Sequence, residues 1–130
     1  AYIARTQAVL QSGEPSNDVL LYWPVHDFWH EEGPYVRQMT VHDPGWMTNQ
    51  PIGKTSASLW RLGYGFDYVS DRQLGQVRAE GGGLVTAGGA SYRALVVPVC
   101  KVMPEGTLEA LRGEVLGWTR RDEASGGDDQ

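Results

Sequence analysis

The spacing of apolar positions changes several times along the chain, and each change predicts a new element. Apolar side chains recur at helical spacing over Tyr2–Gln11, which predicts a short helix. The continuous apolar run Asp18–Trp23 then predicts a strand covered on both faces, as in a parallel sheet. Residues 24–50 show no clean period. They predict a long loop with room for short helical turns, and such loops are often functional.

A second helix is predicted from Pro51 or Ile52 to Leu62, with Thr48 or Asn49 as its N-cap and proline at an early position. Its inner face is expected to consist of Ile52, Ser56, Leu59 and Trp60. Gly63 and Gly65 are expected to end it.

The rest of the chain alternates between strand and helix patterns. The expected elements are a strand Phe66–Val69, a helical turn 71–74 capped by Ser70 or Asp71, two short strands within 77–89, a strand Tyr92–Pro98 and a helix from about Thr107 to Leu116. This alternation predicts an α/β domain with a parallel sheet, whose right-handed crossovers place helices on the sheet faces. A fourth strand is expected after the last helix, yet residues 118–122 lack the pattern of one.

Composition limits the possible functions. The 130 residues, 41% hydrophobic, are enough for one domain with a real core, and the single cysteine excludes a disulfide framework within the chain. The net charge is -5 and no basic run exceeds Arg120–Arg121, so no nucleic-acid partner is predicted. The apolar run Ala94–Cys100 is far shorter than the roughly 20 residues of a membrane-spanning helix, so no membrane partner is predicted either.

The N-terminal residues, Ala1–Arg5, lack the basic and apolar regions of a signal peptide. The chain does not begin with methionine, and we therefore expect it to be part of a longer protein. A single cysteine leaves the redox compartment open, so no localisation is predicted.

The first group of candidate site residues follows the first predicted strand. His26, Asp27 and His30 have side chains that donate and accept hydrogen bonds, and Trp23 and Trp29 have faces on which a sugar ring stacks. Ligands of open α/β sheets bind beyond the carboxyl ends of strands, which favours a binding site here. The alternative is that the tryptophans cover the end of the sheet while His26 and Asp27 cap local turns.

A second group, His42, Asp43 and Trp46, has a similar composition. Imidazole and carboxylate groups suit zinc or manganese, but the two His-Asp pairs match no tight metal-ligand spacing. We therefore predict no metal and no cofactor. A polar sugar-binding or interface loop is the favoured interpretation, with tentative substrate contacts from His26, Asp27, Trp29, His42 and Trp46.

Cys100 is a weak candidate for a nucleophile. It lacks the small neighbours of a sharp strand-to-helix elbow, although Lys101 could lower its pKa. A buried, inert thiol at a strand end is the favoured interpretation. The runs Gly81–Gly83 and Gly88–Gly89 lack the spacing of phosphate-binding loops and are expected to form hairpin turns.

Four stretches, in order, resemble the segment that follows the catalytic barrel of glycoside hydrolase family 106, the α-L-rhamnosidases. Gly63–Asp71 resembles that family's Gly-Tyr-x-Phe-Asp-Tyr-x-Ser-Asp motif. The first stretch consists of 2–7, 10–13 and 18–22, and the other two are Pro24–Trp29 and Ser91–Pro98. The resemblance covers about residues 2–116. The tail after Gly117 departs from the family, which continues with an apolar strand.

The resemblance implies a small three-layer domain of flavodoxin-like, class I glutamine-amidotransferase-like architecture, incomplete at its C-terminal edge, beside a catalytic barrel. It implies that both catalytic acids lie on that barrel, upstream of Ala1, and no residue of this chain matches them. The expected organisation is a helix or linker from the barrel (1–13), an α/β accessory domain (14–118) and a disordered tail (119–130). The expected partners are the barrel and a carbohydrate substrate.

The alternative function is a stand-alone binding or interaction module of flavodoxin-like form. A fragment separated from a barrel is expected to expose an apolar patch, whereas a self-sufficient module would bury it. Tyr2, Ile3, Val9 and Trp60 discriminate between the two. A cysteine-dependent amidotransferase relative is a third, weaker alternative because the nucleophile elbow is missing.

Overall fold

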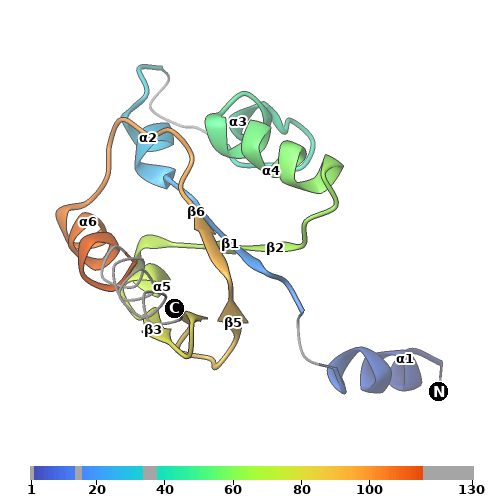
Figure 1. The fold of residues 1–130 in the computed structure, drawn as a ribbon. Coiled ribbons are helices and arrows are strands. Elements are labelled where there is room, and N and C mark those ends of the chain that lie inside the picture. The colour runs from blue at the N-terminus through green and yellow to red at the C-terminus, as the bar shows by residue number, and fades with distance from the viewer. Residues whose placement is uncertain (1, 14–15, 34–37, 116–130) are drawn as a thin grey trace, which may run out of the picture.

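The computed structural model describes residues 2–13, 16–33 and 38–115. Its centre is a three-stranded parallel sheet with the order β2-β1-β6 (Figure 1). The strands are β1 (Val19–Tyr22), β2 (Phe66–Val69) and β6 (Ala94–Val96). All four residues of the middle strand, β1, are buried, as its continuous apolar sequence predicted. The predicted α/β class with a small parallel sheet is confirmed.

A separate antiparallel sheet, in the order β3-β4-β5, lies beside the first. Its strands are β3 (Arg78–Glu80), β4 (Gly83–Val85) and β5 (Ser91–Tyr92). Gly81 and Gly82 connect β3 to β4 with φ of 59° and 77°, the two left-handed residues that a tight hairpin requires. This confirms the predicted excursion of two short strands and its glycine turn.

One predicted strand is divided between the two sheets. β5 pairs with β4 and β6 pairs with β1, and Arg93 lies between them. The amides of Arg93 and Ala94 both donate to the carbonyl oxygen of Asp18, at 2.8 and 3.1 Å, so the chain changes sheets there. The prediction of a single strand over Tyr92–Pro98 is therefore wrong, because an apolar run does not reveal which neighbour each half pairs with.

The helix α4 (Pro51–Arg61) corrects two predictions. Its N-cap is Gln50, with no side-chain hydrogen bond, rather than Thr48 or Asn49. Only Ile52 is buried in α4, and Trp60 is 77% exposed although it was expected to face inward. Gly63, with φ of 82°, ends the helix as predicted.

Residues 24–50 contain two short helices, α2 (Val25–His30) and α3 (Gly45–Thr48). α5 (Asp71–Leu74) is the predicted helical turn, capped by Ser70. The last predicted helix begins earlier than expected: α6 (Glu105–Ala110) follows Pro104 and continues into a π-helical turn, η1 (Leu111–Val115). Leu116, residues 118–122 and the predicted tail 119–130 lie outside the described residues.

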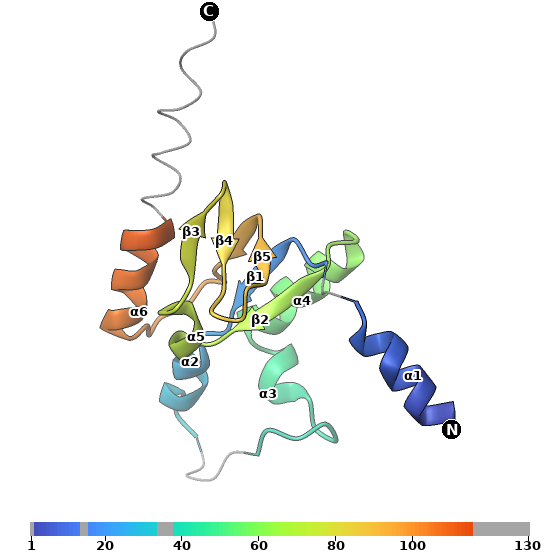
Figure 2. The ribbon, with the colours of Figure 1, turned by 90° about the horizontal axis from the view of Figure 1, so that it is seen from below.

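The helix α1 (Tyr2–Gln11) has the predicted bounds but buries none of its residues. Figures 1 and 2 show it standing apart from both sheets. The largest buried cluster joins the two sheets, with Leu20 and Tyr22 from β1 against Val77, Leu84 and Tyr92. Within the described ranges no helix combines the length and apolar character needed to cross a membrane.

Candidate functional site

The carboxyl ends of the three parallel strands meet at one edge of the sheet, here called the carboxyl edge. α2 follows β1 there, α5 follows β2, and the segment 97–104 follows β6. Ligands of open α/β sheets bind at this edge, which makes it the first place to search for a site.

Asp71 is the centre of a hydrogen-bonded cluster at the carboxyl edge. Its Oδ1 accepts hydrogen bonds from Tyr22 Oη and Thr107 Oγ1, each at 2.6 Å. Its Oδ2 lies 3.6 Å from Nε2 of His26. One carboxylate thus connects β1, α2, α5 and α6.

A capping box holds Asp71 in position. The Ser70 hydroxyl accepts a hydrogen bond from the Gln73 amide, and the Gln73 side chain accepts one from the Ser70 amide. This reciprocal pair fixes the first turn of α5 directly after β2. Asp71, the first residue of that turn, therefore sits beside the end of β1.

The cluster keeps its hydroxyl and thiol groups protonated. Burial, and then the hydrogen bond to Asp71, raise the pKa of Tyr22 well above its ordinary range, so its hydroxyl stays a donor. Burial first, followed by the negative charges of Asp27 and Asp71, raises the pKa of the Cys100 thiol. A raised pKa disfavours the thiolate that a nucleophile needs. The predicted placement is corrected, because Cys100 is half-buried rather than buried and lies in the segment after β6 rather than at a strand end.

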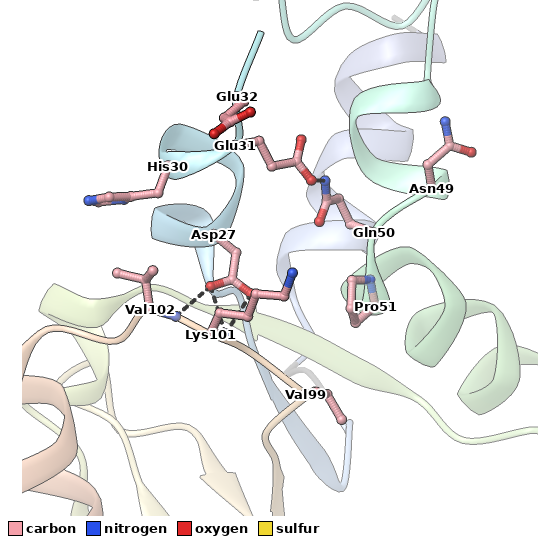
Figure 3. Close-up of a pocket in the computed structure, with 10 residues that line it drawn as sticks. All are labelled: Asp27, His30, Glu31, Glu32, Asn49, Gln50, Pro51, Val99, Lys101 and Val102. Atoms are coloured by element: carbon pink, nitrogen blue, oxygen red, sulfur yellow. Dashed lines mark hydrogen bonds between the residues drawn. The ribbon is translucent and has the colours of Figure 1, made fainter.

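Asp27 ties α2 to the segment after β6. Its carboxylate accepts the amide of Lys101, at 2.9 and 3.0 Å to the two oxygens, and the amide of Val102 at 2.7 Å (Figure 3). Lys101 and Val102 lie in a segment without regular secondary structure, so no neighbouring strand accepts hydrogen bonds from their amides. The Asp27 carboxylate is the acceptor instead. In this structure, Asp27 is a cap for the loop.

A cleft of about 490 Å³ opens above this contact, and we call it the switch-point cleft. The chain runs from β1 to β2 on one side and returns to β6 on the other, so α2 and the segment 97–104 diverge at the topological switch point. Figure 3 shows the cleft between α2, the junction of α3 and α4, and that segment. Its lining includes Glu31, Gln50, Pro51, Val99, Lys101 and Val102.

Three of the five predicted site residues lie together on α2. The His26 ring meets the Trp29 ring edge-on, with centroids 5.1 Å apart and an interplanar angle of 80°. Trp29 is 62% exposed, so its indole face is accessible. Asp27 lies between them in sequence, and its carboxylate holds the loop described above.

The other two predicted residues do not join this group. Trp46 is half-buried, donates from Nε1 to the Thr40 carbonyl oxygen at 2.9 Å, and packs its ring near Trp23 and Phe28. The alternative interpretation placed Trp23 and Trp29 over the end of the sheet. Trp23 is half-buried beside Trp46, whereas Trp29 is 62% exposed. His42 is exposed, and no hydrogen bond or ring contact connects it to α2 in the described part of the chain. Nowhere in those ranges do three His, Cys, Asp or Glu side chains converge in a metal-binding group.

Sequence reasoning missed Asp71, Tyr22 and Thr107. A signal existed for Asp71, because Ser70 and Asp71 come directly after the second parallel strand, where the carboxyl edge had to be. Tyr22 ends the most buried strand, so its hydroxyl needed a partner. Thr107 had no comparable signal in the sequence.

A second carboxylate, Asp67, joins the two sheets. Its Oδ2 accepts hydrogen bonds from Asn17 Nδ2 at 3.0 Å and from Tyr92 Oη at 2.9 Å. Burial, and then this hydrogen bond, raise the pKa of Tyr92 to about 12. Asp67, on β2, thus connects β5 to Asn17, which lies just before β1.

No family model, curated protein or solved structure matches the chain. Its protonated Cys100 does not suit nucleophilic catalysis, and Asp71 and Asp27 are both engaged in holding neighbouring segments. The switch-point cleft is open and has both polar and apolar lining residues, which suits binding rather than chemistry.

Proposed function

We propose that this chain is an accessory α/β domain of a carbohydrate-active glycoside hydrolase of the α-L-rhamnosidase type, and that it supports a catalytic barrel on the same polypeptide. The observation that carries the proposal is the exposure of α1, whose large apolar side chains are 71–76% accessible. These side chains are Tyr2, Ile3, Val9 and Leu10.

The exposed side chains of α1 form a face rather than a scatter. Tyr2 and Val9 are seven residues apart, as are Ile3 and Leu10, and this spacing returns to the same side of a helix after two turns. A helix of this length is marginally stable alone in water, so it needs a surface to pack against. The missing barrel supplies that surface in our proposal.

A second exposed apolar patch lies where α4 leads into β2. Trp60, Leu62 and Tyr64 are 77%, 71% and 53% exposed. Trp60 also lines an open, largely apolar hollow with Met47 and Phe66. Trp60 was one of the residues expected to separate a fragment from a self-sufficient module, and its exposure supports the fragment.

The residues of the family-like motif serve the scaffold. Asp67 holds Asn17 and Tyr92, Ser70 caps α5, and Asp71 holds Tyr22 and Thr107. A motif whose polar residues connect elements is what a supporting domain needs. This supports the resemblance to the domain beside the family's barrel.

The order of the parallel strands also agrees with the proposal. Numbered among themselves, they run second-first-third across the sheet, which is how the flavodoxin-like order begins. We infer a small three-layer, flavodoxin-like and glutamine-amidotransferase-like domain that further strands complete.

In the proposed enzyme, inverting hydrolysis uses a water activated by a carboxylate of the barrel. This chain supplies no catalytic residue. The segment 24–50 reaches toward the carbohydrate, with His26, Asp27, Trp29, His42 and Trp46 as the proposed contacts. Of these, Trp29 has an exposed indole, 62% accessible, on which a sugar ring can stack.

The proposal is tested by the coding DNA on the N-terminal side of Ala1. We expect the reading frame to continue upstream through a barrel that carries two catalytic acids. A start codon directly before Ala1, with no barrel in frame, would contradict it.

The alternative, a stand-alone binding module, is favoured by one observation, the open cleft at the switch point. Under this alternative the isolated chain is monomeric and soluble although the apolar face of α1 is exposed. Under our first proposal, sedimentation velocity of the isolated chain shows self-association that Val9→Lys and Leu10→Lys reduce.

A further inference from the structure

We propose that the switch-point cleft binds a neutral polyhydroxylated ring, a single sugar unit. The inference rests on the proposed function only for the source of that sugar, because the ligand chemistry follows from the cleft itself. Its position, at the divergence of the segments after β1 and β6, is where α/β sheets bind their ligands.

The walls of the cleft are held in place. Asp27 fixes the floor by accepting the amides of Lys101 and Val102. Gln50 Nε2 donates to Glu31 Oε1 and so connects α2 to the start of α4 (Figure 3). The cavity of about 490 Å³ is within the usual size range of ligand sites, and these contacts join its walls.

The polar groups that face the cleft include both donors and acceptors. Figure 3 shows the Lys101 side chain extending from the floor toward Pro51, and the Gln50 side chain spanning the gap to Glu31. In the described residues the Lys101 ammonium has no ion pair or hydrogen bond. The side-chain oxygen of Gln50 can still accept a hydrogen bond, because Gln50 bonds to Glu31 through its side-chain nitrogen, Nε2. Hydroxyl groups match such a mixture because each one both donates and accepts.

Aliphatic surface lies between the polar groups. Pro51, Val99 and Val102 line the cleft, and Val99 is 82% exposed. A sugar ring has hydroxyl groups around its edge and C–H groups on its faces, so it matches a lining that alternates in the same way. A purely polar ligand would leave this apolar surface uncovered.

The charges of the lining oppose an anionic ligand. Asp27, Glu31 and Glu32 carry three carboxylates, against one ammonium on Lys101. His30 also lines the cleft, and its Nδ1 lies 2.7 Å from the His26 carbonyl oxygen. A phosphate or carboxylate group would meet more like charge than opposite charge here, so the cleft favours a neutral ligand.

The test is an NMR titration of the ¹⁵N-labelled 130-residue chain with L-rhamnose, and in parallel with inorganic phosphate. We expect rhamnose to shift the amides of Gln50, Lys101 and Val102 saturably, with a dissociation constant on the order of 1 mM, and phosphate to shift none of them. Lys101→Met should weaken rhamnose binding about tenfold, the loss expected for one hydrogen bond to a charged group. Lys54→Met, on the exposed side of α4, is the matched control and should leave binding unchanged.

The absence of saturable shifts with rhamnose overturns the inference, as does binding of phosphate at the same amides. Equal weakening by Lys101→Met and Lys54→Met also overturns it, because the effect would then be one of general charge. These outcomes are independent of the proposed function. Rhamnose binding without an upstream barrel would support the binding cleft and contradict the hydrolase proposal. An upstream barrel without rhamnose binding would support the hydrolase proposal and contradict the binding cleft.

Discussion

The hydroxyl of Tyr22 donates to Asp71 over 2.6 Å and joins the end of β1 to the helix that follows β2. Thr107 donates to the same oxygen from α6, also at 2.6 Å. Tyr22 is fully buried and Thr107 is 4% exposed, so neither hydroxyl has water as an alternative partner. The contact of β1 and α6 with α5 therefore depends on the Asp71 carboxylate.

Removing that carboxylate should destabilise the domain. Asp71→Ala leaves the hydroxyls of Tyr22 and Thr107 buried without an acceptor, and we expect a loss of about 3 kcal/mol in the free energy of unfolding. Urea denaturation followed by tryptophan fluorescence measures it. Asp18→Ala, which removes an exposed ion pair with Arg93, is the matched control and should cost less than about 1 kcal/mol. Equal losses for the two variants would show that Asp71 does not hold the edge.

Asp27 should control local opening of the segment after β6. In Asp27→Ala the amides of Lys101 and Val102 lose their acceptor, and their hydrogen exchange should accelerate by about tenfold or more. The amide of Thr86, which donates to the Ala90 carbonyl oxygen across the loop between β4 and β5, is the internal reference. If the exchange of all three amides accelerates equally, the effect is global and Asp27 has no local role in holding the segment after β6.

Removing the capping box of α5 should lower stability less than removing the Asp71 carboxylate. Ser70→Ala removes the acceptor for the Gln73 amide and should cost about 1 kcal/mol of stability. Ser58→Ala, within α4, is the control: among the described residues its hydroxyl bonds to the Lys54 carbonyl oxygen alone, and alanine has the higher helix propensity. Ser58→Ala should therefore leave stability unchanged or raise it slightly. A loss at Ser58 as large as at Ser70 would remove the argument for a special cap.

Tyr92 should make the fold sensitive to alkali. Its pKa rises from an ordinary 10.0 to about 12 on folding, so the unfolded chain releases this proton first. The stabilisation is fully present below pH 10 and is lost as pH rises toward 12. Denaturation of the wild type and of Tyr92→Phe across this window isolates the contribution, because other groups titrate alike in both proteins.

We expect the stability difference between the wild type and Tyr92→Phe to shrink from pH 10 to pH 12. A constant difference for Tyr92→Phe over the same range would contradict the raised pKa.

The elements that could be predicted from the sequence are those with a strong local signal. The apolar run of β1, the helical spacing of α1 and the glycine pair between β3 and β4 each predicted a structure that is confirmed. The division of 92–98 between two sheets could not be predicted, because it depends on which strands lie beside each half. Trp60 was misplaced for a related reason: its spacing fits an inner face, but α4 buries only Ile52.

The site was predicted in part. The rule that ligands bind beyond the carboxyl ends of strands predicted a site in the residues of α2. His26, Asp27 and Trp29 do lie together there, at the carboxyl edge. Asp71 and Thr107 were not found, because Asp71 lies 49 residues from Tyr22 and 36 residues from Thr107 along the sequence. Similarly, composition paired His42 with His26, whereas no contact in the described residues connects them.

The central claim is that this domain works as part of a glycoside hydrolase whose catalytic acids lie on another domain. The most direct test compares hydrolysis of an aryl α-L-rhamnoside by the polypeptide of the complete reading frame and by the 130-residue chain alone. The account predicts rhamnose release by the former and none by the latter. Rhamnose release by the isolated chain, or none by the complete polypeptide, would contradict it.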